Sequence, residues 1–366
     1  MNHDAMSAAR DRMLMDRALF HAARGVGRTT PNPMVGAVVL SAAGVVVGHG
    51  WHERAGEAHA EVNAFEEAGD ATRGGTLFVT LEPCCHTGRT PPCTKRIIAA
   101  GISRVVAAMR DPDARVGGKG FAELRAAGIQ VEEGLGGEEA RRLNEAYLTV
   151  KAQHRPLVIL KAAASLDAKI GRIGERTKLS SAEADRKTHQ LRSAVDAIAV
   201  GSETLLVDDP LLTARESHRI RPLVRVLFDR RLRTSPRARV LSTLSHGPVI
   251  IVTDESNLDA GRGVIVELER AGATVRSAAT FGDALKALLE WDISTLLVEG
   301  GARLHAAFLQ AGLVDRIHLI VTPQTLGSGG VPLFGGARVG VSALHRMTVE
   351  ARGADTWIES DVHRNR

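Results

Sequence analysis

The chain reads HAE at residues 59–61 and TLEPCCHTGRTPPC at residues 80–93, and these two stretches decide its fold. All three cysteines of the 366-residue chain, Cys84, Cys85 and Cys93, lie in the second stretch. Such crowding of a rare residue indicates a metal or catalytic site more than a disulfide framework. One histidine and two cysteines supply three ligands that suit tetrahedral Zn²⁺ with an open fourth position. The two stretches therefore predict a zinc site.

The expected ligands are His59, Cys84 and Cys93, and the open position takes a water molecule whose pKa the metal lowers. Glu61 lies two residues beyond the histidine, in the first turn of a predicted helix. From there it can take the proton of the water and return it to the reacting ring, as the catalytic acid–base residue. The pattern resembles that of zinc deaminases, which space their cysteines as P-C-x-x-C. Here eight residues separate Cys84 from Cys93, so the loop between them is longer.

Cys85 is not an expected ligand, because adjacent residues on an extended segment point to opposite sides. Two other interpretations stay open at this point. In the first, Cys85 or His86 supplies a fourth ligand and closes a structural zinc site. In the second, the cysteines form a cluster without a metal.

Outside these stretches, strand patterns alternate with short helical patterns, which is typical of an α/β fold. Apolar runs in the first part predict strands at 34–40, 45–50, 76–81, 104–109 and 129–132. Amphipathic patterns there predict helices at 6–23, 59–68, 94–100, 120–127 and 138–153. The second part has predicted strands at 157–163, 197–200, 223–229, 249–253, 295–298 and 317–321, and predicted helices at 182–193, 282–289 and 302–311. We therefore expect two α/β domains, residues 1–153 and 154–366.

The composition is that of an ordinary globular protein, with 44% hydrophobic and 24% charged residues. It excludes a disordered tail protein, a collagen-like fibre and a disulfide scaffold. The net charge of +5 is spread over 47 basic and 42 acidic residues, and 3% aromatic residues disfavour single-stranded nucleic acid as a partner. The N-terminus lacks a signal-peptide pattern, and Pro and Gly interrupt the longest uncharged stretch, residues 29–52. We expect a cytoplasmic protein that binds neither nucleic acid nor membrane.

Four stretches of the first domain resemble the deaminase half of the bifunctional riboflavin-biosynthesis deaminase/reductase family: PNPMVGAVV (31–39), HAE (59–61), TLEPCCHTGRTPPC (80–93) and AMRDP (108–112). The long cysteine spacing with GRTPP separates the chain from cytidine and tRNA deaminases. The resemblance implies a cytidine-deaminase-like α/β/α sandwich with one zinc ion, acting on 2,5-diamino-6-(5-phosphoribosylamino)pyrimidin-4(3H)-one. It also implies that four residues contact the pyrimidine or its ribose phosphate, namely Asn32, His52, His86 and Arg89.

The second domain has no G-x-G-x-x-G after a strand, so a Rossmann dinucleotide site is not supported. The sequence VEGGARL (298–304) places two glycines between a strand and a helix, where free N–H groups can bind an anion. This stretch, together with KAAASLD (161–167), TLLVDDPLLTAR (204–215) and VTPQTLG (321–327), resembles the reductase half of the same family. The resemblance implies a dihydrofolate-reductase-like fold, NADPH as cofactor, and reduction of the ribosyl group to ribityl.

By the same resemblance, the cofactor is contacted by Ala163, Thr204, Asp208, Gly301, Ala302, Arg303, Leu304 and His305. The substrate is contacted by Arg192, Leu212, Arg215 and Glu299, in which the two arginines suit a phosphate clamp. One segment departs from the family, because Lys178 stands where relatives carry a tryptophan near the cofactor. We assign Lys178 to the cofactor and Arg176 to the substrate. Two interpretations stay open: these two cations bind the 2′-phosphate of the cofactor, or the site is weakened.

Two rival functions remain at this stage. A zinc deaminase of nucleosides or RNA needs a basic groove with aromatic side chains, which this composition does not favour. A non-enzymatic regulator with a degenerate reductase domain has only Lys178 in its favour. The family resemblance further implies a homodimer or a higher homo-oligomer, and a small phosphorylated pyrimidine as the molecule that the enzyme binds.

Overall fold

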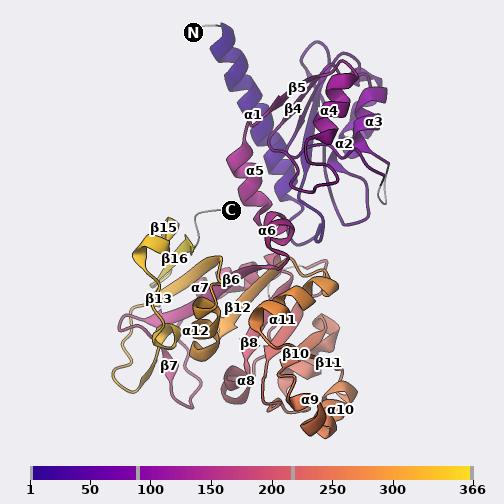
Figure 1. The fold of residues 1–366 in the computed structure, drawn as a ribbon. Coiled ribbons are helices and arrows are strands. Elements are labelled where there is room, and N and C mark those ends of the chain that lie inside the picture. Colours follow the sequence, from indigo (N-terminus) through magenta and orange to yellow (C-terminus); the bar gives the residue numbers. More distant parts are fainter. Residues whose placement is uncertain (1–2, 88–90, 216–218, 363–366) are drawn as a thin grey trace. The chain divides into compact units, whose positions relative to one another are not determined.

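The computed structural model describes residues 3–87, 91–215 and 219–362, and the chain divides into two compact units, 1–153 and 154–366 (Figure 1). Within the described ranges, no helix combines the length and the apolar character that a membrane span requires.

The first unit is built on a five-stranded sheet with the order β2-β1-β3-β4-β5. β1 is antiparallel to both β2 and β3, whereas β3, β4 and β5 run parallel to one another. The strands are β1 (Gly36–Leu40), β2 (Val46–Trp51), β3 (Thr76–Val79), β4 (Arg104–Ala107) and β5 (Gln130–Glu133). Strands β1 and β3 are apolar and almost fully buried, as expected of the centre of a sheet covered on both faces.

Helices cover both faces of this sheet, which confirms the α/β/α sandwich. They are α1 (His3–Ala23), α2 (Ala60–Ala68), α3 (Cys93–Ala99), α4 (Lys119–Ala126), α5 (Gly137–Leu143) and α6 (Glu145–Gln153), with a short 3₁₀ turn at Gly69–Thr72. Glycines let two of them approach the strands closely. A Cβ at Gly36 would lie 2.0 Å from the Ala18 carbonyl of α1, and one at Gly50 would lie 2.4 Å from the Ala60 carbonyl of α2. In the β1–β2 pairing, Gly36 lies opposite Trp51, and Gly50 lies opposite Ala37 in the next pair. Successive pairs point to opposite faces of the sheet, so α1 and α2 cover opposite faces.

The single helix predicted over residues 138–153 is two helices, because Asn144 interrupts it. The Asn144 side chain accepts a hydrogen bond from the Met34 N–H (2.7 Å) and donates one to the Met34 carbonyl (2.9 Å). The Asn144 side chain thus forms hydrogen bonds with the backbone just before β1, in the way that a neighbouring strand would. The periodicity of apolar residues does not reveal such contacts.

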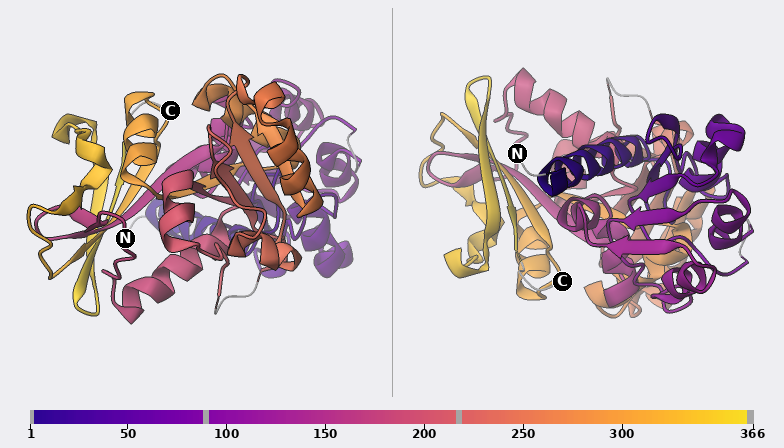
Figure 2. Two further views of the ribbon diagram at one scale, coloured as in Figure 1. Left: turned by 90° about the horizontal axis from the view of Figure 1, so that it is seen from below. Right: turned by 90° about the horizontal axis from the view of Figure 1, so that it is seen from above.

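The second unit contains a nine-stranded sheet with the order β11-β10-β9-β8-β12-β6-β13-β16-β15. The strands from β11 to β13 in this order are parallel, and the hairpin β15–β16 adds antiparallel to β13, as the yellow edge of the sheet in Figure 2 shows. The strands are β6 (Leu157–Ser165), β8 (Ala197–Gly201), β9 (Val224–Phe228), β10 (Val249–Thr253), β11 (Ala273–Ser277), β12 (Thr295–Gly300), β13 (Arg316–Thr322), β15 (His345–Arg352) and β16 (Asp355–Asp361). A separate ribbon pairs β7 (Lys169–Arg172) with β14 (Gly330–Pro332).

The helices of this unit are α7 (Ala182–Ala194), α8 (Ser202–Asp208), α9 (Asn257–Ala260), α10 (Arg262–Arg270), α11 (Phe281–Leu288) and α12 (Ala302–Gln310), with 3₁₀ turns at Arg239–His246, Leu289–Trp291, Leu333–Gly336 and Val341–Ala343. The sequence analysis did not predict β7, β11, β14, β15, β16, α8, α9 and α10. Most of these are short, and β15 exposes most of its side chains, so they carry weak hydrophobic patterns.

The entry into β6 is held by a buried ion pair. The Arg155 guanidinium donates to both carboxylate oxygens of Asp315, at 2.7 and 2.9 Å, and the Val158 N–H donates to the same carboxylate at 2.8 Å. A forked pair of this kind fixes geometry as well as charge. It sets the start of the strand that carries Lys161 and Ala163 into the cleft described below.

Candidate active sites

Three elements bring the expected zinc ligands together in the first unit. His59 is the residue that precedes α2, Cys84 lies in the loop after β3, and Cys93 is the first residue of α3. The His59 Nδ1 atom lies 3.2 Å from the Cys93 Sγ and 3.6 Å from the Cys84 Sγ. All three ligand atoms lie within 4.8 Å of one another, in the one cluster of this kind that the described part of the chain contains.

These spacings fit a tetrahedral zinc ion. With Zn–N near 2.0–2.1 Å and Zn–S near 2.3 Å, tetrahedral geometry places a nitrogen and a sulfur ligand about 3.6 Å apart. Two sulfur ligands are then separated by about 3.8 Å. Three residues of the types that zinc prefers are therefore set at the distances that one ion requires. Zinc sites with three protein ligands keep the fourth position open for water.

The pKa shifts of Cys84 and Glu61 suit a metal ligand and a neighbouring base, respectively. Hydrogen bonding to Cys93 and to the His59 ring outweighs burial and lowers the pKa of Cys84, which favours the thiolate form that binds a metal. Glu61 is 3% exposed in the first turn of α2, and burial raises the pKa of its carboxyl group. A carboxylate with a raised pKa next to a metal-ligand cluster is suited to accept and return a proton.

Two of the residues expected to contact the substrate lie against each other. The Asn32 amide donates to His52 Nε2 at 3.0 Å, and His52 Nδ1 donates to the Ala58 carbonyl at 3.0 Å. The His52 ring meets the His59 ring edge-on, with 5.5 Å between the centroids, so this pair borders the ligand cluster. His86 follows two residues after Cys84, and its buried Nδ1 has no partner within the described ranges. Arg89 lies outside the described residues.

Cys85 lies apart from the ligand cluster. Its thiol contacts the Arg115 carbonyl at 3.8 Å, whereas the Cys84 sulfur contacts His59. The two adjacent side chains therefore take different directions, as expected of an extended segment.

We expect the Cys85→Ser variant to keep one zinc ion per chain, because the substitution removes no atom of the ligand cluster. Metal analysis of the purified variant measures this directly. Cys93→Ser is the matched control, and it should lose most of its zinc because a neutral hydroxyl replaces a thiolate ligand. Loss of zinc from Cys85→Ser would show that the ligand set is wrong.

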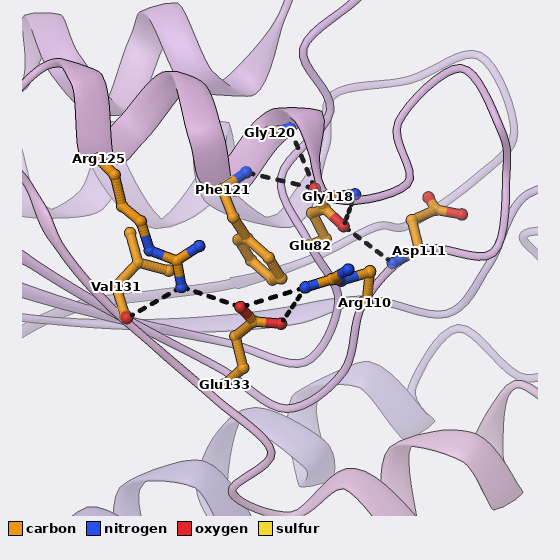
Figure 3. A network of polar contacts seen from close by, with 9 residues as sticks. All are labelled: Glu82, Arg110, Asp111, Gly118, Gly120, Phe121, Arg125, Val131 and Glu133. Carbon is orange, nitrogen blue, oxygen red and sulfur yellow. Dashed lines mark hydrogen bonds and ion pairs between the residues drawn. The ribbon is translucent and has the colours of Figure 1, made fainter.

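A buried carboxylate in the zinc-site loop organises the neighbouring backbone (Figure 3). Glu82 is 3% exposed and lies two residues before Cys84. One of its oxygens accepts from the N–H groups of Asp111 (3.2 Å) and Gly118 (2.9 Å), and the other from Gly120 (3.0 Å) and Phe121 (3.3 Å). The carboxylate thereby ties the Pro83-Cys84 turn to the segment 111–121. Sequence analysis did not assign a role to Glu82, because its four partners are 29–39 residues away.

The second unit has a cleft of about 1170 Å³. Most of the residues that the resemblance assigned to cofactor or substrate line this cleft, namely Ala163, Arg176, Lys178, Thr204, Asp208, Arg215, Glu299, Gly301, Ala302, Arg303, Leu304 and His305. They come from β6, the 170–180 segment, α8, β12 and α12, except for Arg215, which lies in the loop after α8. The cleft is larger than common ligand pockets, so it has room for a dinucleotide together with a sugar phosphate.

Two of the residues that we expected to contact the substrate do not line the cleft. Arg192 and Leu212 are not among the residues that line the cleft. The Arg192 guanidinium forms a fork on the Glu299 carboxylate at 2.5 and 2.7 Å, and it also donates to the Thr213 carbonyl at 3.0 Å. Three of its five N–H donors are thus engaged with the protein, and the predicted contact of Arg192 and Arg215 with a substrate phosphate stays a prediction. Leu212 is buried.

Lys161 is a cleft residue that sequence reasoning missed. It lines the cleft from within β6, where burial lowers the pKa of its ammonium group and the Glu299 carboxylate opposes that shift. Glu299 is itself buried, but the fork of Arg192 outweighs burial and lowers the pKa of its carboxyl group to about 2. A lone lysine inside the apolar run LVILKAA was the available signal, since charged side chains are rare in buried strands.

The segment with the departing residues lies at the cleft. Lys178 is largely exposed, with its ammonium group 3.7 Å from Asp185. Arg176 is close enough to Asp208 to oppose the rise that burial causes in the pKa of that carboxyl group. Both cations therefore line the cleft, and each has an acidic neighbour.

Two family models match the chain. The model of the cytidine and deoxycytidylate deaminase zinc-binding region matches residues 8–109, and the model of the RibD C-terminal domain matches residues 156–358. Among curated relatives, the riboflavin biosynthesis protein RibD of Aquifex aeolicus is 42% identical over 322 residues, which cover 87% of this chain and 88% of the relative. The protein of that name in Escherichia coli is 37% identical over 333 residues, which cover 87% and 89%.

Two solved structures are similar to nearly the whole chain. Acinetobacter baumannii RibD has a TM-score of 0.86 at 32% identity, covering 98% of this chain and all of that one. A Thermotoga maritima diaminohydroxyphosphoribosylaminopyrimidine deaminase/5-amino-6-(5-phosphoribosylamino)uracil reductase has a TM-score of 0.83 at 34% identity, covering 97% and 99%.

Proposed function

The chain belongs to the RibD family, the bifunctional deaminases and reductases of riboflavin biosynthesis, and from this premise we propose which reaction each unit performs and through which residues. The first unit deaminates 2,5-diamino-6-(5-phosphoribosylamino)pyrimidin-4(3H)-one to 5-amino-6-(5-phosphoribosylamino)uracil. The second unit reduces the ribosyl group of that product to ribityl. The observation that carries the first assignment is the cluster of His59, Cys84 and Cys93 with the buried Glu61 beside it.

In the first unit, His59, Cys84 and Cys93 hold Zn²⁺, which lowers the pKa of a water molecule when it is bound. Glu61 would accept one proton from the attacking water and deliver it to the ring nitrogen. It would then accept the proton of the newly formed hydroxyl and deliver it to the amine, which leaves as ammonia as the carbonyl forms. Burial raises the pKa of the Glu61 carboxyl group, which favours its accepting a proton. Asn32 and His52 hold the pyrimidine beside the ligand cluster, together with His86 and Arg89.

In the second unit, the cleft holds NADPH, which supplies the hydride. Gly301 precedes α12 with φ of 84°, so its backbone lies open at a helix N-terminus where a cofactor phosphate can bind. Ala163, Lys178, Thr204, Asp208 and residues 301–305 contact the cofactor. Glu299, Arg215 and Arg176 face the substrate, and Lys161 joins them. These residues accelerate the reaction by holding cofactor and sugar face to face.

Incubation of the protein with the diaminopyrimidine substrate, with and without NADPH, tests this proposal. Mass spectrometry should show the exchange of an amino group for oxygen in both samples, and a gain of two hydrogens only with NADPH. An unchanged substrate in both samples would contradict the deaminase assignment. A deaminated product that gains no hydrogen would contradict the NADPH assignment alone.

We expect Glu299 to make the stability of the second unit depend on acid. Its pKa is about 2 in the folded protein and 4.5 in the reference state, so the stabilisation is complete above pH 4.5 and is lost as the pH falls toward 2. The free energy of unfolding should drop by about 2 kcal/mol between pH 6 and pH 3 from this group.

Urea denaturation followed by the fluorescence of Trp291 and Trp357, in a Trp51→Phe background, measures this drop. The Glu299→Gln variant should lack that part of the pH dependence, because an amide does not titrate in this range. Equal acid sensitivity of both proteins would show that the Arg192–Glu299 pair does not set the pKa.

The pyrimidine substrate follows from membership of the family. A homodimer or larger assembly, a cytoplasmic location and the absence of nucleic-acid or membrane partners stay predictions of the sequence.

A further inference from the structure

The last helix of the first unit, α6, carries three polar side chains on one side. Asn144 directly precedes α6, and its carbonyl accepts from the Leu148 N–H at 2.9 Å, as expected of the residue before a helix. Tyr147 and Lys151 lie three and seven positions beyond Asn144, a spacing that places all three on one side of a helix. The Lys151 ammonium group accordingly lies 5.4 Å from the centre of the Tyr147 ring. Together Asn144, Tyr147 and Lys151 form the polar face of α6.

The first residue of this face holds the segment that enters β1. Asn144 is 1% exposed, and its side chain bonds to both the N–H and the carbonyl of Met34, at 2.7 and 2.9 Å. Met34 lies two residues after Asn32 and directly before Val35. Because both backbone groups of Met34 are held, the segment 32–35 has little freedom to shift relative to α6.

Two residues proposed to hold the pyrimidine are attached to this segment. Asn32 belongs to it, and its amide donates to His52 Nε2 at 3.0 Å. The His52 backbone N–H donates to the Val35 carbonyl at 2.9 Å, so His52 is tied to the segment at its backbone as well as at its ring. The His52 ring also meets the ring of the expected zinc ligand His59. The placement of Asn32 and His52 beside the ligand cluster therefore depends on where Met34 is held.

The other two residues of the polar face anchor α6 to the loop after β4. The Tyr147 hydroxyl donates to the Asp111 carboxylate at 3.0 Å, and the Lys151 ammonium group donates to the Asp113 carboxylate at 2.8 Å. Both carboxylates are buried, and hydrogen bonds shielded from water are stronger than exposed ones. The Asp111 N–H in turn binds Glu82 in the zinc-site loop (Figure 3). The helix that follows the Met34 contact is thus fixed to the segment that supports the metal ligands.

We propose that Asn144 is a positioning residue for deamination: by holding Met34, it sets Asn32 against His52 so that the two bind the pyrimidine beside the zinc site. The inference rests on the deaminase function proposed above and adds to it a residue that acts through the backbone of another. A misplacement of about 1 Å caused by a distant substitution can cost about 10²-fold in rate, so a support of this kind has a measurable effect.

Steady-state ammonia release by the zinc-loaded full chain tests the inference. We expect Asn144→Ala to raise the KM for the diaminopyrimidine by about 10–100-fold and to change kcat by less than about threefold. The reason is that the groups positioned by Asn144 bind the ring and do not transfer the proton. The zinc content, and the reduction of the deaminated intermediate by NADPH, should stay at wild-type values. A fall in kcat at unchanged KM would overturn the inference.

A double-mutant cycle separates positioning from a general loss of stability. Residues that act through one another have non-additive effects, whereas independent losses multiply. In an Asn32→Ala background, Asn144→Ala should therefore raise KM by less than about threefold, because most of what Asn144 supports is already absent. The same 10–100-fold rise in both backgrounds would show that Asn144 does not act through Asn32.

Thr72→Val is the matched control, because it removes a buried side-chain bond to the backbone at the other end of the same strands. The Thr72 hydroxyl donates to the Ala100 carbonyl at 2.7 Å, before the amino ends of β3 and β4, whereas Cys84 follows the carboxyl end of β3. This variant should also lower the stability of the first unit, but it should keep the wild-type KM. An equal rise of KM in Thr72→Val would overturn the inference.

Tyr147→Phe tests the same inference if Asn144→Ala does not fold, since it removes one hydroxyl and keeps the ring. It should raise the same KM by about threefold or more, because α6 loses one of its bonds to the loop after β4. A wild-type KM in Tyr147→Phe, or wild-type kinetics in Asn144→Ala, would overturn the inference and leave the deaminase function intact. No release of ammonia by the wild type would contradict the deaminase function itself.

Discussion

Replacing Glu61 by alanine is expected to lower the deamination rate by about 10³-fold or more, because general acid–base catalysis by one positioned group contributes about 10²–10⁴-fold. Glu61 is expected at the upper end of that range since the same carboxylate takes part in more than one proton transfer. It is 3% exposed, so bulk water does not easily replace it. Ammonia release from the diaminopyrimidine substrate measures the effect.

The second activity supplies the internal control. The cleft lies within residues 154–366, whereas Glu61 lies in the other compact unit. Reduction of the deaminated intermediate by NADPH should therefore stay at the wild-type rate in Glu61→Ala. The zinc content should also be unchanged, because Glu61 is not one of the three ligands. If both activities fell together in a variant that keeps its zinc and its fold, the assumption of two independent sites would be wrong.

The zinc site was predictable because its signal is local. His59 and Glu61 are two residues apart at a helix start, and both cysteines flank one loop, so spacing alone specified the candidate ligands. The α/β class was predictable as well, since the buried strands are apolar runs such as GAVVL and VIIVT. Those predictions needed no knowledge of which strands are neighbours.

What the sequence analysis missed depends on partners far along the chain. Glu82 is recognisable as a scaffold only once residues 111–121 are folded around it. The fork of Arg192 on Glu299 likewise joins residues that lie 107 positions apart in the chain. The Asn144 interruption similarly depends on Met34, 110 residues earlier. Local patterns carry no information on these contacts, because a side chain that serves a distant backbone segment leaves the local periodicity unchanged.

The cleft shows the same limit at a larger scale. Its residues come from the ends of four strands whose spatial order, β6-β12-β8-β9, differs from their order in the chain. Glycines in VEGGARL indicated a binding site, but nothing local connects them with Lys161 or Arg215, which line the same cleft. The family resemblance supplied individual residues, and the strand order was needed to show that they line one cleft.

Replacing Glu82 by alanine is expected to lower the free energy of unfolding of the first unit by about 4 kcal/mol or more. The substitution leaves four N–H groups without their acceptor, and each buried group that loses its partner costs about 1–3 kcal/mol, less where water enters. Glu82→Gln should be intermediate, because the amide keeps one accepting oxygen and turns an NH₂ group toward two N–H donors. Urea denaturation followed by Trp51 fluorescence, in a Trp291→Phe/Trp357→Phe background, measures this unit.

Glu133→Gln is the matched control, since this carboxylate also takes part in several polar contacts in Figure 3. Glu133 binds Arg110 at 3.1 Å and Arg125 at 2.9 Å, but its side chain is 28% exposed and its partners are more exposed still. Exposed ion pairs contribute about 0–1 kcal/mol, so this variant should stay within about 1 kcal/mol of the wild type. The Glu82 variants should also bind zinc less tightly, because the loop that presents Cys84 loses its anchor, whereas Glu133→Gln should bind zinc normally. If the Glu82 and Glu133 variants were equally stable, burial of the Glu82 carboxylate would not be what makes it an anchor of the loop.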